Sequence, residues 1–451
     1  MPTGTYQQLR HALVLISAFK SVISRRVFSA EQLSVTFKFT QRLERYMSGP
    51  QIDILTPEYE ADPNPILDDI RENHPIYFHE GLDSWVLSRH DDILEALRTP
   101  AFTTNNYAWQ LEPVHGKNIL QLEGKEHRSM RAIVTPTLRG DQLRENFASV
   151  AENNAKELID VWKHDGEVEL VSQFTLRLPL SVIIDVLGLD AEDKPKFHVW
   201  YNAIHDYFTN TAGDPEVEAA GLRTHDELRD FMMPLIQERK KNPGDDLISK
   251  IVHAEIDGER MSDIDIKSYI SFLLVAGSES TDLQMSNMWL RLLENPDQLQ
   301  AVREDRSLVR TAFAEALRHT PAVLMIMREA SQDVEFHGTK IPAGSTVTLM
   351  LAAANRDPRQ FTAPETFNIF RDDLDTDKEF TAAANHMTFA LGRHFCIGTY
   401  LAAMEAEIAT NLLLDAMDDI AFADGKPPQQ VGSFVRAPRN MPLTFTPVAK
   451  T

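Results

Sequence analysis

The sequence predicts a mainly α-helical fold with small β-sheets. Two long regions, residues 142–252 and 262–294, repeat apolar residues at the spacing of a helix. Breaks in the first region fall near Gly166, residues 187–189 and residues 242–244. Shorter segments near the start of the chain and beyond residue 320 lie between glycines and prolines, as strands and turns do.

The totals exclude several classes of protein. The 451 residues are 43% apolar and 25% charged, which is ordinary for a globular protein with a large core. The net charge of −22 argues against a nucleic-acid partner, because phosphate binding needs clustered lysine and arginine. The single cysteine rules out an intrachain disulfide and suits a reducing compartment, so we expect a cytoplasmic protein. No apolar run approaches the roughly 18–20 residues of a membrane helix, so we expect no transmembrane segment.

Residues 1–46 differ in composition from the rest of the chain. They are basic and rich in serine, with only Glu31 and Glu44 as acids. That composition fits a transit peptide or a helix on a membrane surface. An upstream start codon, read before a true start near Met47, explains it equally well. We therefore expect an N-terminal extension at 1–46 and one domain over residues 47–451.

The first regular elements follow in order. Residues 65–71 have the spacing of an amphipathic helix. Residues 76–79 and 84–88 alternate around a Glu-Gly turn, which predicts a β-hairpin. Residues 91–97 return to helical spacing. Residues 100–121 have no clear period, which predicts a long loop of the kind that often carries function.

Later elements are shorter. Residues 311–318 have helical spacing, and residues 321–327 form an apolar segment that predicts a strand in the core. Residues 333–347 contain glycine and proline at intervals and predict strands joined by turns. Residues 432–436 predict a final turn near the end of the domain.

The stretch from Phe389 to Gly398 contains the only cysteine, Cys396. A lone cysteine is usually a small buried apolar residue. Here, however, Gly392 and Gly398 frame it, and residues 399–409 are alanine-rich with helical spacing. The sulfur therefore precedes a helix N-terminus, where an anionic thiolate is favoured. One thiolate cannot complete a structural zinc or iron–sulfur site, but it suffices for one axial bond to haem iron.

This stretch resembles the cysteine-ligand loop of cytochrome P450, whose usual form is Phe-Gly-x-Gly-x-His-x-Cys-x-Gly. One position departs, with Ala390 in place of glycine. The resemblance implies a single-domain cytochrome P450 fold, a haem b and Cys396 as the iron ligand. It also implies a set of cofactor-binding residues in the loop: Phe389, Gly392, His394 and Gly398.

Within residues 262–294, an apolar run ends in a polar segment at residues 277–281. We expect a helix with a local defect, because a serine hydroxyl can bond the carbonyl four residues back and bend the helix. By resemblance, Ala276 and Gly277 lie against the haem, and Glu279 and Ser280 deliver protons. Ser280 stands where the family usually has threonine, so it lacks the methyl that restricts its rotamers.

Two further pairs of residues gain a role from the resemblance. His127 and Arg131 are four apart and share a helix face, which alone indicates an exposed surface. In the family, such a pair binds the haem propionates, and Arg328 and His394 join it. Glu315 and Arg318 would likewise be a weak surface pair in isolation. The family buries this Glu-x-x-Arg beneath the haem, where Arg371 is our candidate third member.

The resemblance extends over about residues 60–446. It implies a substrate pocket covered by the paired helices of residues 192–240 and by the loop of residues 100–121. The loop aromatics Tyr107 and Trp109 are further candidates for the pocket wall. The expected pocket residues are Phe102, Leu273, Val323, Leu324 and Phe434. It also implies a monooxygenase that inserts one atom of O₂ into a small, largely apolar molecule by hydroxylation, epoxidation or dealkylation, in specialised metabolism or catabolism.

The electrons must come from outside the chain, from NAD(P)H through a ferredoxin and its reductase. Arg128 and Arg393 are candidates for docking the ferredoxin, and we expect a monomer.

Two alternatives remain open at this point. Some members of the family couple or desaturate their substrates without net oxygen insertion. Residues 124–127 and 355–358 resemble bacterial members that oxidise cyclic dipeptides. The other alternative is a haem-based gas sensor, which binds O₂ without consuming reductant.

Overall fold

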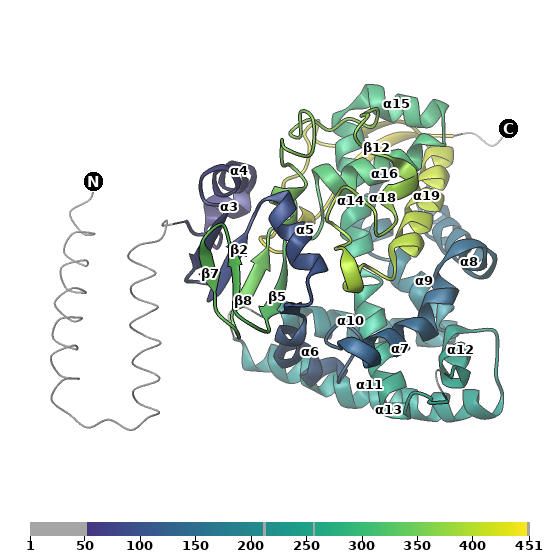
Figure 1. The fold of residues 1–451 in the computed structure, drawn as a ribbon. Coiled ribbons are helices and arrows are strands. Elements are labelled where there is room, and N and C mark those ends of the chain that lie inside the picture. The colour runs from purple at the N-terminus through teal and green to yellow at the C-terminus, as the bar shows by residue number, and fades with distance from the viewer. Residues whose placement is uncertain (1–51, 211–212, 256–257, 449–451) are drawn as a thin grey trace. The chain divides into compact units, whose positions relative to one another are not determined.

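The computed structural model describes residues 52–210, 213–255 and 258–448, and residues from Ile52 onward form one compact unit. The N-terminal extension expected at 1–46 lies outside the described residues. The expected fold class is confirmed, because the unit is mainly helical with small sheets (Figure 1). Among the described residues, no helix is both long and apolar enough to cross a bilayer.

The helices account for most of the fold. Their bounds are α3 Pro57–Ala61, α4 Asn64–Asn73, α5 His90–Arg98, α6 Ala108–His115, α7 Gly124–Val134, α8 Gly140–Asp160, α9 Leu178–Val186, α10 Lys194–Thr209, α11 Pro215–Lys241, α12 Leu247–His253, α13 Asp263–Ala276, α14 Glu279–Glu294, α15 Pro296–Glu304, α16 Leu308–His319, α17 Leu351–Ala354, α18 Thr376–Glu379 and α19 Thr399–Ala416.

The largest sheet has the strand order β1-β2-β8-β5-β3. Its strands are β1 Ile76–His79, β2 Ser84–Leu87, β8 Thr346–Leu349, β5 Ile326–Ala330 and β3 Phe102–Thr103. Only β2 and β8 run parallel within it. A second sheet joins β4 Glu167–Glu169, β12 Pro442–Pro447 and β9 Met417–Phe422. The two-stranded sheets are β6 Val334–Phe336 with β7 Thr339–Ile341, and β10 Gln430–Val431 with β11 Ala437–Pro438.

The core divides between the helices and the large sheet. Figure 1 shows the sheet on one side and α14, α16 and α19 grouped on the other. The larger apolar cluster includes the fully buried Trp162 and Trp289 and joins α8, α9, α13, α14, α16 and α19. A smaller cluster joins the sheet to the residues just before Cys396. The cysteine loop therefore lies where the two clusters meet.

Two predicted elements are wrong. The loop predicted over residues 100–121 contains β3 and the helix α6. Pro113 inside α6 and the exposed Trp109 on it, which is 77% exposed, obscure the helical pattern. The strand predicted over residues 321–327 begins only at Ile326, because Val323 makes an isolated bridge to Val435.

Candidate active site

A cavity of about 330 Å³ lies between the cysteine loop, the junction of α13 with α14, α16 and the start of β5. Most of its wall is apolar. Thirteen of the residues predicted for the site line it: Tyr107, His127, Arg131, Leu273, Ala276, Gly277, Ser280, Val323, Arg328, Phe389, His394, Cys396 and Gly398. The fold thus brings together segments that lie nearly 300 residues apart in the chain.

Cys396 presents its sulfur to this cavity at the start of α19. Its amide donates to the Phe389 carbonyl (2.9 Å), and the Thr399 hydroxyl donates to the Cys396 carbonyl (3.0 Å). Burial raises the pKa of the thiol, while the amides of Gly398 and Thr399 and the charge of Arg131 oppose that rise. The loop therefore holds the sulfur in place and directs donors towards it.

The backbone of the cysteine loop requires left-handed conformations at two positions. Gly392 has φ +72°, and a Cβ there would lie 2.3 Å from the Leu97 carbonyl oxygen, so only glycine fits. Ala390, which stands where the family pattern has glycine, has φ +53°. The alanine thus adopts a left-handed conformation that favours glycine, which places strain in the loop.

Four arginine and histidine side chains line the cavity: His127, Arg131, Arg328 and His394. Arg328 is 5% exposed, and its guanidinium donates to the Met327 carbonyl (2.8 Å). Arg131 donates to the Phe395 carbonyl. The rings of His127 and His394 lie 4.3 Å apart between centroids, and burial lowers the pKa of both imidazoles.

Glu123, which no sequence motif singled out, lies beside this group. Its carboxylate lies 3.2 Å from His394 Nε2 and 2.7 Å from Arg393 Nε. Arg393 also donates to the carbonyls of Thr99 and Phe102. The guanidinium of Arg393, a predicted docking residue, is therefore largely occupied within the chain, whereas Arg128 is exposed.

The predicted helix with a local defect is confirmed as two helices, α13 ending at Ala276 and α14 beginning at Glu279. The Ser278 hydroxyl donates to the Leu274 carbonyl (2.6 Å), which is the back-bond expected of a serine at such a bend. A Cβ at Gly277 would lie 2.8 Å from Ile183 Cδ1, so the packing requires glycine there. The Ser280 and Thr281 side chains line the cavity.

Six predicted residues lie away from the cavity wall: Phe102, Trp109, Glu279, Leu324, Gly392 and Phe434. Phe102 packs with Phe336 in the smaller apolar cluster, at 6.0 Å between ring centroids. Leu324 is buried in a third cluster under α3 and α4. Phe434 is 38% exposed, and its carbonyl accepts from the Leu324 amide (2.9 Å). Their distance from the wall reflects how the loops pack, which local sequence does not encode.

Glu279 faces the other side of α14. Its Oε1 lies 3.5 Å from Nε2 of His205 on α10, and burial raises the pKa of its carboxyl. His205 was not among the predicted residues, and neither were Ile183 and Gln284, which line the cavity. None of these three belongs to a short motif, so no sequence signal could have identified them.

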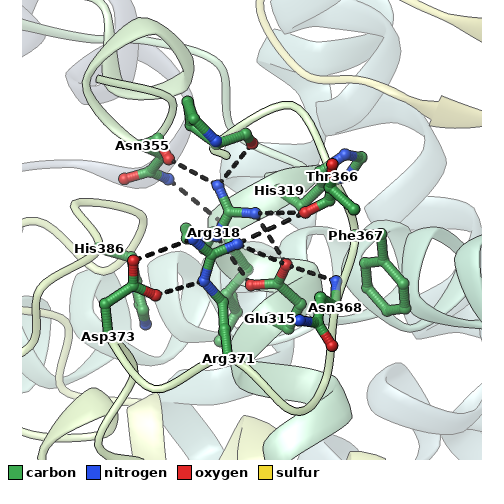
Figure 2. A network of polar contacts seen from close by, with 12 residues as sticks. Glu315, Arg318, His319, Asn355, Thr366, Phe367, Asn368, Arg371, Asp373 and His386 are labelled. Atoms are coloured by element: carbon green, nitrogen blue, oxygen red, sulfur yellow. Dashed lines mark hydrogen bonds and ion pairs between the residues drawn. The ribbon is translucent and has the colours of Figure 1, made fainter. Parts of the chain in front are cut away.

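The pair Glu315 and Arg318 is completely buried, with two hydrogen bonds of 2.7 Å between guanidinium and carboxylate. Figure 2 shows Arg318 surrounded by backbone and side-chain oxygens. Arg371 lies 3.4 Å from the Glu315 carboxylate and also pairs with Asp373. The three-membered network predicted from sequence is therefore present as a set of contacts.

This network is connected to the cavity through Asn355. The Asn355 carbonyl accepts from Arg318 (3.1 Å), and its side-chain amide donates to the Thr388 hydroxyl (2.8 Å). Thr388 lines the cavity just before the cysteine loop. The buried ion pair thus supports the segment that leads to Cys396.

The residues at the cavity fit a haem group. The cavity is apolar, one thiolate faces it, and the buried cation of Arg328 pairs with no carboxylate among the described residues. A buried charge of this kind needs an anionic partner, which a haem propionate would supply. Within the described residues, no cluster of three or more His, Cys, Asp or Glu side chains could hold a metal ion by itself.

The cytochrome P450 family model matches residues 77–445, so the chain belongs to the cytochrome P450 family. It is 36% identical over 394 residues to pulcherriminic acid synthase of Bacillus subtilis, covering 87% of this chain and 97% of that protein.

Two solved structures share the fold. The bacillaene polyketide synthase cytochrome P450 PksS of Bacillus subtilis has 27% identity and a TM-score of 0.78, over 88% of this chain and 100% of that one. P450BioI, solved with an acyl carrier protein ligated to hexadec-9Z-enoic acid, has 28% identity and a TM-score of 0.77, over 86% and 100%. The protein is accordingly a cytochrome P450 oxidoreductase, and its family implies a haem-thiolate iron cofactor.

Proposed function

We propose that this cytochrome P450 oxidises a small, largely apolar molecule of specialised metabolism, with O₂ and electrons from NAD(P)H. The observation that carries the proposal is the apolar cavity that has Cys396 on one wall and the α13–α14 junction on another. When bound, haem b supplies the activation of O₂, with the thiolate donating electron density to the iron.

Each group of site residues has a role in this proposal. Cys396 ligates the iron, and the cationic and imidazole groups hold the propionates: His127, Arg131, Arg328 and His394. Phe389, Gly392 and Gly398 shape the cysteine loop, while Ala276 and Gly277 keep space open at the cavity. Ser280 passes protons into the cavity from Glu279 beside it.

The cavity wall supports an apolar substrate. Phe272, Leu273, Ile183, Val323 and Ile326 line it with hydrocarbon. The polar groups among them are few, as in most small-molecule sites, where they orient the ligand. One of them is the Tyr107 hydroxyl, which accepts from the Met327 amide (2.9 Å) and keeps its own proton free to donate.

A second candidate function is the oxidative conversion of a cyclic dipeptide. It is suggested by residues 124–127, which resemble bacterial family members that oxidise cyclic dipeptides. The short motif at residues 355–358 gives no support of its own, because Asn355 and Asp357 are buried in the scaffold. The Thr281 hydroxyl on the cavity wall suits the polar ring of a cyclic dipeptide, whereas the Gln284 amide already accepts from the Ala322 amide (2.8 Å) and donates to the Thr320 carbonyl (3.4 Å).

Optical titration of the purified ferric protein tests both candidates. Terpenes, aromatic acids and cyclic dipeptides with two aliphatic side chains are added in turn, and the haem band is followed from low to high spin. A saturable shift identifies the substrate class, and consumption of O₂ and NADH with product formation then excludes a gas sensor. A folded protein with no haem band would overturn the proposal.

We also propose that electrons arrive from a ferredoxin and its reductase, and that the protein acts as a monomer in the cytoplasm. Because Arg393 is occupied by Glu123, docking of an acidic ferredoxin rests on the exposed Arg128. An Arg128→Glu variant should slow reduction by ferredoxin, whereas Arg223→Glu, on the exposed side of α11, should not. Equal reduction rates in the Arg128→Glu variant and the unmodified protein would contradict this role.

A further inference from the structure

His205 on α10 joins the Glu279 carboxyl to solvent. Its Nε2 lies 3.5 Å from Glu279 Oε1, and its Nδ1 lies 3.5 Å from Asp206 Oδ1. The His205 side chain is 38% exposed, whereas that of Glu279 is 25% exposed. The imidazole thus has one nitrogen towards the half-buried carboxyl of Glu279 and a larger exposed surface of its own.

The other ionisable groups near this contact are less suited to exchange protons with solvent. Asp282, one turn after Glu279, is 4% exposed and close to Ser286 (3.5 Å), and burial raises its pKa to about 7. Tyr201, one turn before His205, is 7% exposed, and its ring lies 6.3 Å from the imidazole. Glu169 acts on Asp282 only through its charge. His205 is therefore the most exposed ionisable side chain in direct contact with the Glu279 carboxyl.

We propose that His205 supplies protons from solvent to Glu279 and so sets the pH dependence of proton delivery to the cavity. The inference rests on the proposed function, in which Glu279 and Ser280 deliver protons. His205 acts only through Glu279, and it is therefore a positioning residue of the relay and not a catalytic one.

The proton transfer balances without any change of oxidation state. The Nε2–H bond of the imidazolium breaks, and an O–H bond forms on Glu279 Oε1. His205 is left neutral and takes a new proton from water, while Asp206 keeps its carboxylate at the other ring nitrogen. The protonated carboxyl, no longer attracted by a cation, is free to rotate towards Ser280, whose side chain lines the cavity.

Three variants of the holoenzyme test this role. His205→Gln keeps a polar side chain but cannot carry a proton, and His205→Lys keeps a charge that does not titrate near neutral pH. His198→Gln is the matched control, because His198 lies on the same helix α10, two turns before His205, and the charges that act on its imidazole are those of Arg177 and Lys194. NADH oxidation is measured between pH 6 and 8.5 in H₂O and D₂O, with a surrogate ferredoxin and the cyclic dipeptide that shifts the haem band most.

We expect His205→Gln to lower the rate about tenfold at pH 6 to 7 and to enlarge the solvent isotope effect, since general acids contribute on that scale or above. His205→Lys should give a flat pH profile. The His198→Gln variant should behave like the unmodified protein. Added imidazole should restore part of the rate to His205→Ala, because the site is open to solvent.

A second readout needs no turnover. The positive charge of His205 lowers the pKa of the Glu279 carboxyl against the effect of burial. The infrared band of the protonated carboxyl, assigned by its loss in Glu279→Gln, should therefore persist to higher pH in His205→Gln than in the unmodified protein. An identical band titration in the two proteins would show that the two side chains are not coupled.

The outcomes separate the two proposals. If the unmodified protein oxidises NADH with O₂ and His205→Gln keeps its rate, pH profile and isotope effect, the role of His205 is wrong and the proposed function stands. A faster His205→Gln variant would mean that the imidazole restrains the Glu279 carboxyl instead of supplying it with protons, and the proposed role would be wrong. Absence of O₂-dependent turnover in the unmodified, haem-loaded protein would overturn both.

Discussion

The ammonium nitrogen of Lys267 lies 3.2 Å from Nδ1 of His225, and the Lys267 side chain is completely buried. Lys267 lies on α13, and His225 lies on α11. The ammonium also donates to the His115 carbonyl at the end of α6 (3.3 Å). One buried lysine thus joins three helices, including α13, which lines the cavity, and no carboxylate among the described residues neutralises it.

Replacing Lys267 with methionine should stabilise the protein at neutral pH. Burial lowers the pKa of Lys267 from 10.5 to about 8, so below pH 8 the folded state holds a charge that it disfavours. Between pH 8 and 10.5 the unfolded chain binds more protons than the folded one, so stability rises with pH and the penalty disappears. We expect the methionine variant to gain about 2 kcal/mol at pH 7 and much less at pH 10.

Urea unfolding at both pH values measures this difference. Lys241→Met, at the exposed end of α11, is the control and should show no such dependence on pH. A Lys267→Met variant that is less stable than the unmodified protein at pH 7 would show that the hydrogen bonds of the lysine outweigh its desolvation.

Ala390→Gly should stabilise the cysteine loop. Ala390 has φ +53°, and a left-handed conformation costs a residue with a Cβ about 1–2 kcal/mol. Glycine removes this cost, but it also raises the entropy of the unfolded chain, which offsets part of the gain in stability. We expect a net gain of about 0.5–1 kcal/mol, measured by urea unfolding followed through the haem band. Ala148→Gly, inside α8, should instead lose about 1 kcal/mol. Equal losses in the two variants would refute the strain at Ala390.

Glu315→Gln should destabilise the protein strongly. The substitution leaves Arg318 buried with its charge uncompensated, a change that typically costs about 3–5 kcal/mol. Urea unfolding and the ratio of haem to protein absorbance measure the loss of stability and of haem. Asp226→Asn removes an exposed pair of the same spacing, Asp226 with Arg229, and should change little. Similar losses of stability in both variants would show that burial of the Glu315–Arg318 pair does not increase its contribution to stability.

Ser280→Thr should lower the amount of NADH consumed per product formed. The Ser280 hydroxyl lines the cavity, and an added methyl restricts its rotamers, which favours one position for proton transfer. NADH and product are quantified together, with peroxide as the waste product. Ser181→Thr, at a half-buried position of the otherwise largely buried α9, controls for general effects of the added methyl. The same ratio of NADH to product in Ser280→Thr and the unmodified protein would contradict a role for side-chain restriction.

The short motifs allowed accurate predictions because their chemistry is local. Cys396 with its two glycines, and Glu315 with Arg318, lie within one turn or one loop, so spacing alone brings the partners together. The bend at Ser278 was also predictable, since a serine hydroxyl reaches the carbonyl four residues back in any helix.

The pocket residues from loops were not predictable in the same way. Phe102 looked like a wall residue but packs behind the wall against Phe336, which lies over 200 residues away. The helix α6 was hidden because Pro113 and the exposed Trp109 interrupt its apolar pattern. Burial of a loop side chain depends on which distant element covers it, and no local pattern records that.

By itself, the sequence determined the family, through the resemblance of the Cys396 loop, and it placed Glu315 and Arg318 three residues apart on one helix, while their burial was implied only by that resemblance. Only the tertiary structure decided that Glu279 faces His205, that Arg393 pairs with Glu123 and that Lys267 joins three helices. These contacts join residues from 42 to 270 positions apart. Their chemistry depends on distance and desolvation, which exist only once the helices have packed.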